Sequence, residues 1–193
     1  MPIPDSSITD QQKKWFASVR EGLERDTGKT VEEWVKIFRK CPETSYKKQA
    51  DWLRANYGLG VNRAAMVIYA ADPEKAAAED DPSLLVAGLW RDPAQLKIHD
   101  ALVAHVSKMK GGIVGEKKTF TGFSRKYQFA AIRPTKDGVR LGIAVPSKSS
   151  KRFEAPKKNE GWSDRNKGVV VLTSTKDIDA EIKALLKAAF EAS

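Results

Sequence analysis

The chain has 193 residues and a formal net charge of +9 at pH 7, and 41% of its residues are hydrophobic. This composition supplies enough apolar surface for a packed core and excludes a disordered chain. No apolar run approaches the roughly 18 residues that a membrane span needs, and no secretory signal opens the sequence, so we expect no membrane partner. The single cysteine, Cys41, excludes an intramolecular disulfide and predicts a cytoplasmic location.

The first part of the chain carries apolar residues at helical spacing. Thr9 can cap a first helix that Gly28 ends, and Thr30 with Glu33 forms a capping box that opens a second helix. The expected helices span about residues 9–26, 30–41, 45–57 and 61–71. Short connections between four short helices predict a compact all-α domain over residues 1–76.

The second part of the chain combines helical and strand patterns. The acidic stretch 72–82 loses the helical period, so it is the expected linker to a domain at residues 77–193. Helices are expected at about residues 82–90, 93–109 and 175–190, and strands at about 117–123, 127–133, 139–145 and 169–173. This order predicts an α+β fold, an antiparallel four-stranded sheet with helices packed on one face.

Positive charge is concentrated in the second part of the chain. Residues 1–81 hold 13 Lys and Arg against 14 Asp and Glu, whereas residues 82–193 hold 21 against 11. The whole excess therefore belongs to the α+β domain. Such an asymmetry points to an anionic partner, namely nucleic acid, an acidic protein or a phosphate-bearing ligand. A lysine-rich surface that only keeps the protein in solution gives the same count.

The expected polyanion-binding surface lies within residues 117–168, on the sheet and on the long loop that follows it. Its candidate cations are Lys117, Lys118, Arg125, Lys126, Arg133, Arg140, Lys151, Arg152, Lys157 and Lys158. Phe120, Tyr127 and Phe129 lie among these cations and could stack on bases, as aromatic residues of single-strand binders do. The alternative is that the aromatic rings belong to the core and only the charges face water.

A second candidate phosphate contact lies in the helical domain. Gly58 and Gly60 separate the third and fourth expected helices, and Arg63 follows them. This pattern resembles the helix-hairpin-helix of DNA-binding proteins, in which glycines let a phosphate approach the free amides of the next helix. The alternative is an ordinary glycine-capped turn between packed helices.

Several familiar motifs are incomplete, so we expect no cofactor, no metal and no catalytic residue. The Gly-Lys-Thr triplet at residues 28–30 looks like the end of a phosphate-binding loop, but position 23 is Leu23 and a helix precedes the triplet. His99 and His105 share a helix about 120° apart around its axis, so they cannot chelate one metal. No serine lies in a nucleophile elbow. An enzyme is therefore disfavoured, although acidic residues distant in sequence can still meet in the fold.

Both parts of the chain carry the motifs of one protein family. The helical part has Trp15-Phe16, Thr27-Gly28-Lys29-Thr30 before Glu33-Trp34, and Trp52-Leu53 before Tyr57-Gly58-Leu59-Gly60. The α+β part has Lys118-Thr119-Phe120, Gln128-Phe129-Ala130, Leu141-Gly142 and Val171-Leu172-Thr173-Ser174. With these motifs the chain resembles an uncharacterised bacterial two-domain family, a small helical domain of unknown function followed by an α+β domain of unknown function. The resemblance implies the fold and the domain split, and it implies no activity.

These observations lead to one preferred function and two alternatives. The preferred hypothesis is a non-enzymatic binding protein for nucleic acid or another polyanion, which binds through residues 117–168. The first alternative is a small-anion pocket between sheet and helices, with or without catalysis, in which Arg125, Arg133 or Arg140 clamps a carboxylate or phosphate. The second alternative is a protein-interaction module whose helical domain docks a partner.

Overall fold

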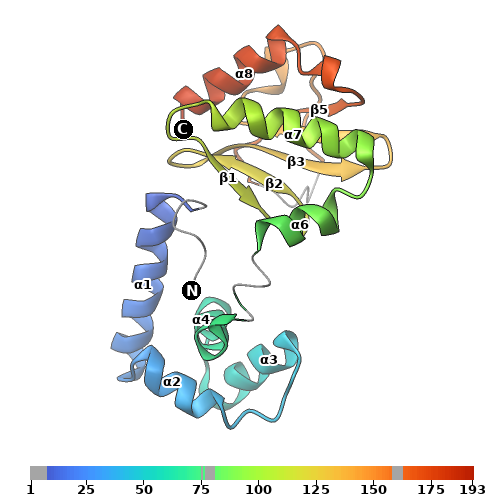
Figure 1. The fold of residues 1–193 in the computed structure, drawn as a ribbon. Helices are drawn as coiled ribbons and strands as arrows, with labels where there is room; N and C mark the ends of the chain where they lie inside the picture. Colours follow the sequence, from blue (N-terminus) through green and yellow to red (C-terminus); the bar gives the residue numbers. More distant parts are fainter. Residues whose placement is uncertain (1–7, 75, 77–80, 158–162) are drawn as a thin grey trace. The chain divides into compact units, whose positions relative to one another are not determined.

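The computed structural model describes residues 8–74, 76, 81–157 and 163–193, which fall into two compact units (Figure 1). The first unit contains the helices α1 (Asp10–Thr27), α2 (Val31–Phe38), α3 (Tyr46–Tyr57) and α4 (Val61–Ala71). The second unit contains the helices α6 (Pro82–Leu89), α7 (Pro93–Ser107) and α8 (Ala180–Glu191) and the strands β1 (Ile113–Glu116), β2 (Thr121–Ser124), β3 (Gln128–Thr135), β4 (Gly138–Ile143) and β5 (Gly168–Leu172). Within these described ranges, no helix is both long enough and apolar enough to cross a membrane. The predicted α+β class is confirmed.

Polar contacts fix how the helices of the first unit begin and meet. The predicted capping box is present, because the Thr30 hydroxyl accepts from the Glu33 amide at 3.2 Å and the Glu33 carboxylate accepts from the Thr30 amide at 2.8 Å. The Trp34 indole donates to the Thr27 hydroxyl at 2.9 Å, which ties α2 to the end of α1. Apolar side chains from these helices form the core of the unit. The buried ones are Leu23, Val31, Trp34, Phe38, Leu53, Leu59, Ala64, Val67 and Ile68.

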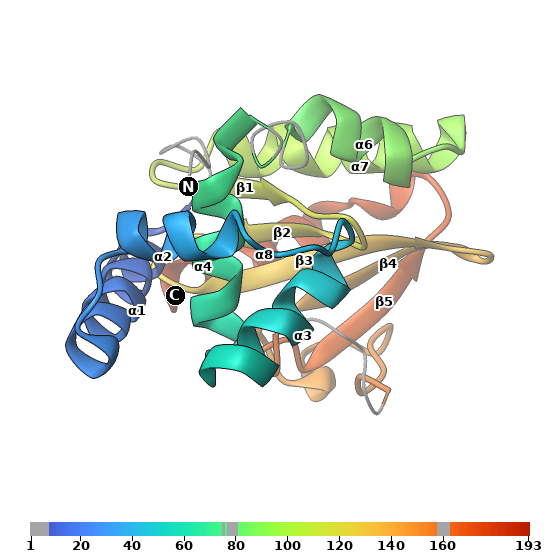
Figure 2. The same cartoon turned by 90° about the horizontal axis from the view of Figure 1, so that it is seen from below.

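The sheet is an antiparallel meander with the strand order β1-β2-β3-β4-β5 (Figure 2). The prediction of four strands was wrong in this respect, because residues 117–123 do not form one strand. The Lys117 amide donates to the Phe120 carbonyl at 3.0 Å and closes a turn between β1 and β2. Gly111 adopts a φ of 85° after α7, which lets the chain reverse at once into the short strand β1.

The main core of the second unit lies between the sheet and the helices α7 and α8, which lie on the same face of the sheet (Figure 1). Ile132, Leu141 and Val170 are cross-strand neighbours in this core. Side chains alternate between the two faces of a strand. Arg133 and Arg140, each one residue away from this row on its own strand and paired with each other, therefore lie on the opposite face.

A β-bulge sets the direction of Phe129. Two residues of β3 oppose one residue of β2 at this point, so Phe129 is an extra residue in its strand. Regular alternation from Arg133 would place Phe129 on the face away from the helices. Instead its ring is fully buried and meets Phe190 of α8 edge to face, with ring centroids 5.5 Å apart.

A buried polar network connects α7 to the strands β1 and β2. His99 is 3% exposed, with Nδ1 2.8 Å from Asp100 Oδ1 and Nε2 3.1 Å from Glu116 Oε1. The Thr121 hydroxyl donates to Glu116 at 2.6 Å and accepts from the Trp90 indole at 3.1 Å. A neutral imidazole has one N–H, so only its charged form donates to both carboxylates. Burial opposes that charge, but the hydrogen bonds with Glu116 and Asp100 raise the pKa of His99 above its ordinary value.

We expect this network to stabilise the fold below about pH 6.5, which is near the pKa of an unfolded histidine. Because the pKa of His99 is raised in the folded state, the stabilisation is complete below the unfolded pKa and is lost as the pH rises through the folded pKa. NMR titration of the full chain should show His99 titrating above its ordinary value, and Glu116→Gln should lower that pKa. A His99 that titrates at or below its ordinary value, with no response to Glu116→Gln, would contradict the network.

Candidate functional site

The turn between β2 and β3, residues 125–127, carries two cation–π contacts. In an antiparallel meander successive turns lie at alternate ends of the strands, and this turn lies at the end where α7 finishes and β1 begins. The Arg125 guanidinium is 4.9 Å from the centre of the Phe190 ring, and the Arg165 guanidinium is 4.2 Å from the centre of the Tyr127 ring. We call Arg125, Lys126, Tyr127 and Arg165 the turn surface.

The turn surface presents its charges to solvent. Arg125, Lys126 and Arg165 are exposed, and Tyr127 is 43% exposed. In the part of the chain that the structure describes, no carboxylate forms an ion pair with any of these three cations. Their charge is therefore available to an anion from solution.

The remaining candidate cations on the hairpins lie elsewhere on the sheet. Lys117 and Lys118 belong to the turn between β1 and β2, at the opposite end of β2 from Arg125. Arg133 lies toward that opposite end as well, in the last third of β3. The cations that the sequence places close together are thus divided between two ends of the sheet.

Arg140 was expected on an exposed surface, whereas the structure buries it. Its side chain is buried on the face away from the helices, with the residue 5% exposed, and its Nη1 donates to Glu154 Oε1 at 2.5 Å. Glu154 forms an isolated β-bridge with Val169, so the segment around it extends the sheet beyond β5. To bind Arg140, a ligand would have to enter this buried site and displace the Glu154 carboxylate from the guanidinium.

The long loop after β4 contributes fewer available cations than its composition implies. Arg152 donates to Asp179 Oδ2 at 2.7 Å and to the Asp177 carbonyl at 3.1 Å, and it is 3.6 Å from Glu181. It therefore holds the loop against the start of α8. Lys151 and Lys157 are exposed, and Lys158 lies outside the described residues.

The three candidate stacking residues differ in exposure. Tyr127 is the most exposed of them. Phe120 is half-buried, and its Cε2 lies 3.3 Å from where a Cβ on Gly122 would be, so its ring covers that glycine. Phe129 is fully buried because of the β-bulge, so its ring belongs to the core, which is the alternative stated for the aromatic residues in the sequence analysis.

The glycine hairpin of the first unit has the geometry of a capped turn. Gly58 follows α3 with a φ of 69°, and Gly60 precedes α4 without a side-chain cap. Arg63 forms an ion pair with Asp26 of α1. Hydrogen bonds from Arg25 and then from Arg63 lower the pKa of Asp26. Arg63 therefore has a structural partner, and phosphate binding at this hairpin stays a prediction.

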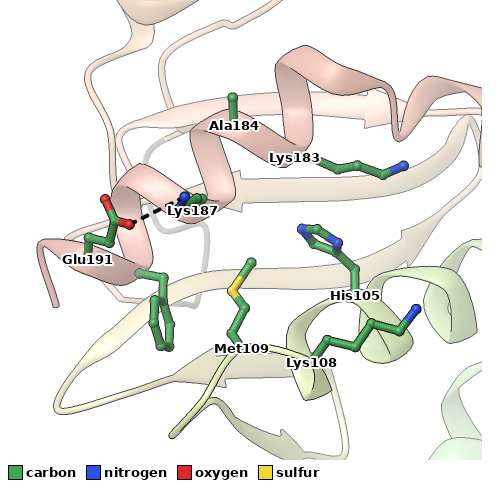
Figure 3. Close-up of a pocket in the computed structure, with 8 residues that line it drawn as sticks. His105, Lys108, Met109, Lys183, Ala184, Lys187 and Glu191 are labelled. Atoms are coloured by element: carbon green, nitrogen blue, oxygen red, sulfur yellow. Dashed lines mark ion pairs between the residues drawn. The ribbon is translucent and has the colours of Figure 1, made fainter.

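A groove between the end of α7 and α8 gathers cations that the sequence analysis did not select (Figure 3). Its volume is about 500 Å³. Lys108, Lys183 and Lys187 line it together with the half-buried apolar side chains of Met109 and Phe190. Lys183 and Lys187 are one helical turn apart, which is a visible signal, but the facing residues of α7 can be recognised only in the fold.

His105 faces the same groove (Figure 3). Its Nε2 is buried and has no hydrogen-bond partner among the described residues. Burial, followed by the charges of Lys183 and Lys108, lowers the pKa of His105. A buried polar atom without a hydrogen-bond partner destabilises a protein by about 1–3 kcal/mol. A ligand that hydrogen-bonds to Nε2 would remove this cost and bind more tightly.

The described residues contain no group of three or more His, Cys, Asp or Glu side chains that could hold a metal ion. The turn surface and the groove both combine cations with aromatic rings, and such groups attract anions and π systems.

Two family models match the chain. Residues 15–72 match Domain of unknown function (DUF4287), and residues 86–193 match Domain of unknown function (DUF5655). No curated protein and no solved structure matches it. The resemblance to a two-domain family of unknown function is confirmed. Because the second match covers more than half of the sequence, the chain belongs to the DUF5655 family and carries a DUF4287 domain before that domain.

Proposed function

We propose that the protein is a non-enzymatic binding protein for single-stranded nucleic acid, which it engages through the turn surface. The observation that carries the proposal is the pairing of each guanidinium with an aromatic ring, Arg125 with Phe190 and Arg165 with Tyr127. Cations held beside aromatic rings can contact phosphates, and the exposed ring of Tyr127 offers a base a surface on which to stack. Lys126, between Arg125 and Tyr127 in the sequence, adds a third exposed charge.

The absence of carboxylate partners at the turn surface supports this choice over the other cations of residues 117–168. Arg140 and Arg152 already neutralise acidic groups of the same chain, so a phosphate would have to displace Glu154 or Asp179 from them. Arg125 and Lys126 would exchange only water and counterions. Counterion release favours binding at low salt and makes the affinity fall as salt rises.

A matched pair of variants tests the proposal. Arg125→Ala/Lys126→Ala should weaken binding of a fluorescent single-stranded oligonucleotide by about tenfold and reduce the salt slope by about 1.4, because each lost phosphate contact removes about 0.7. Lys117→Ala/Lys118→Ala removes the same charge from the opposite end of β2 and should leave both quantities nearly unchanged. Anisotropy titrations of the full chain across a salt series measure them.

The outcome that would overturn the proposal is equal weakening by the two double variants, because it would indicate nonspecific attraction to net charge. Binding that is weak and independent of salt in the unmodified chain would overturn it as well.

A separate prediction concerns Tyr127. Tyr127→Ala should weaken binding of single strands by about 1–3 kcal/mol, because one stacked base is lost, whereas Tyr127→Phe should retain most of the affinity. Duplex of the same length should respond little to either change, since its bases are already stacked on each other. An equal response of single strands and duplex to Tyr127→Ala would show that the ring does not stack on a base.

A further inference from the structure

We propose that the groove between α7 and α8 binds a small organic phosphate, with its phosphate group at Lys108, Lys183 and Lys187 and its apolar body on Met109 and Phe190 (Figure 3). The cations of this site are separate from those of the turn surface, although Phe190 lines the groove and also supports Arg125. The proposal does not depend on nucleic-acid binding. Its occupant is a free small molecule, because the groove volume of about 500 Å³ lies within the range of about 300–1,000 Å³ that such ligands fill.

The charge of the groove matches that of a phosphate monoester. Three lysines and Glu191 line it, which leaves a net of two positive charges. A phosphate monoester carries about −1.5 to −2 at pH 7. Lys187 and Glu191 are 3.9 Å apart and both are more than half exposed, so their ion pair is weak and leaves the ammonium able to turn toward a phosphate.

The apolar side chains that line the groove favour a ligand that carries an apolar group as well as a phosphate. Met109 and Phe190 line the groove together with the lysines, and both side chains are half-buried. Inorganic phosphate would leave these side chains exposed to water. A ring or branched chain attached to the phosphate would cover them and gain the corresponding hydrophobic free energy.

His105 provides an independent reason for an acidic ligand. Its Nε2 is buried in the groove region without a partner among the described residues, and a phosphate oxygen can accept a hydrogen bond from it. The charged groups that line the groove with it are Lys108 after α7 and Lys183, Lys187 and Glu191 on α8. Without ligand, burial and the lysines lower the pKa of His105. A bound phosphate places negative charge beside the ring and should raise that pKa.

Calorimetric titration of the full chain with phenyl phosphate tests the site, with inorganic phosphate as the probe for the head group alone. We expect phenyl phosphate to bind at least about tenfold more tightly than inorganic phosphate. Lys183→Ala/Lys187→Ala should weaken phenyl phosphate binding at least about tenfold. Lys117→Ala/Lys118→Ala, which removes two exposed or half-exposed lysines elsewhere in the same unit, should not change it.

NMR titration of the two imidazoles provides a second readout. Saturation with phenyl phosphate should raise the pKa of His105 and leave that of His99 unchanged, because His99 lies in the separate buried network. Equal affinity for phenyl phosphate and inorganic phosphate, equal loss in both lysine variants, or no binding at millimolar ligand would each overturn the proposal.

Discussion

Phe190 connects the core of the second unit to the turn between β2 and β3 and to the groove beside α8. Its ring packs edge to face on Phe129 in the core, supports the Arg125 guanidinium and forms part of the floor of the groove. The contact with Phe129 exists only because the β-bulge turns that residue toward α8. The end of α8 is thereby fixed against the turn between β2 and β3, and one side chain both lines the groove and contacts Arg125 of the turn surface.

The sequence predicted those features that local patterns determine. Thr30 and Glu33 predicted the start of α2, and Asp92 before Pro93 predicted the start of α7. Such caps can be recognised in the sequence because they depend on residues close together in the chain. The direction of Phe129 depends on how β3 pairs with β2, so strict alternation gave the wrong face. The groove requires α7 and α8 to meet although more than 70 residues separate Lys108 from Lys183, and no local pattern encodes that contact.

The distribution of charge shows why a count of basic residues does not define a binding surface. Arg140 and Arg152 contribute to the excess of positive charge in residues 82–193, yet both are partners of acidic groups in the same unit. Guanidinium groups form such pairs readily because their planar donors match a carboxylate. Arg125 and Arg165 instead rest on aromatic rings, and no carboxylate of the described residues forms an ion pair with them.

The three lysines of the groove differ in what the fold gains from them. Lys108 is the residue after the last turn of α7, where a positive charge interacts favourably with the partial negative charge of the helix end. Lys183 is in the first half of α8, where the helix dipole does not stabilise a cation, and its charge also lowers the pKa of His105. Its aliphatic stem could cover apolar surface, but a methionine would do so without the unfavourable charge. The ammonium group of Lys183 therefore gains nothing from the helix dipole, and an anion in the proposed site would offset its charge.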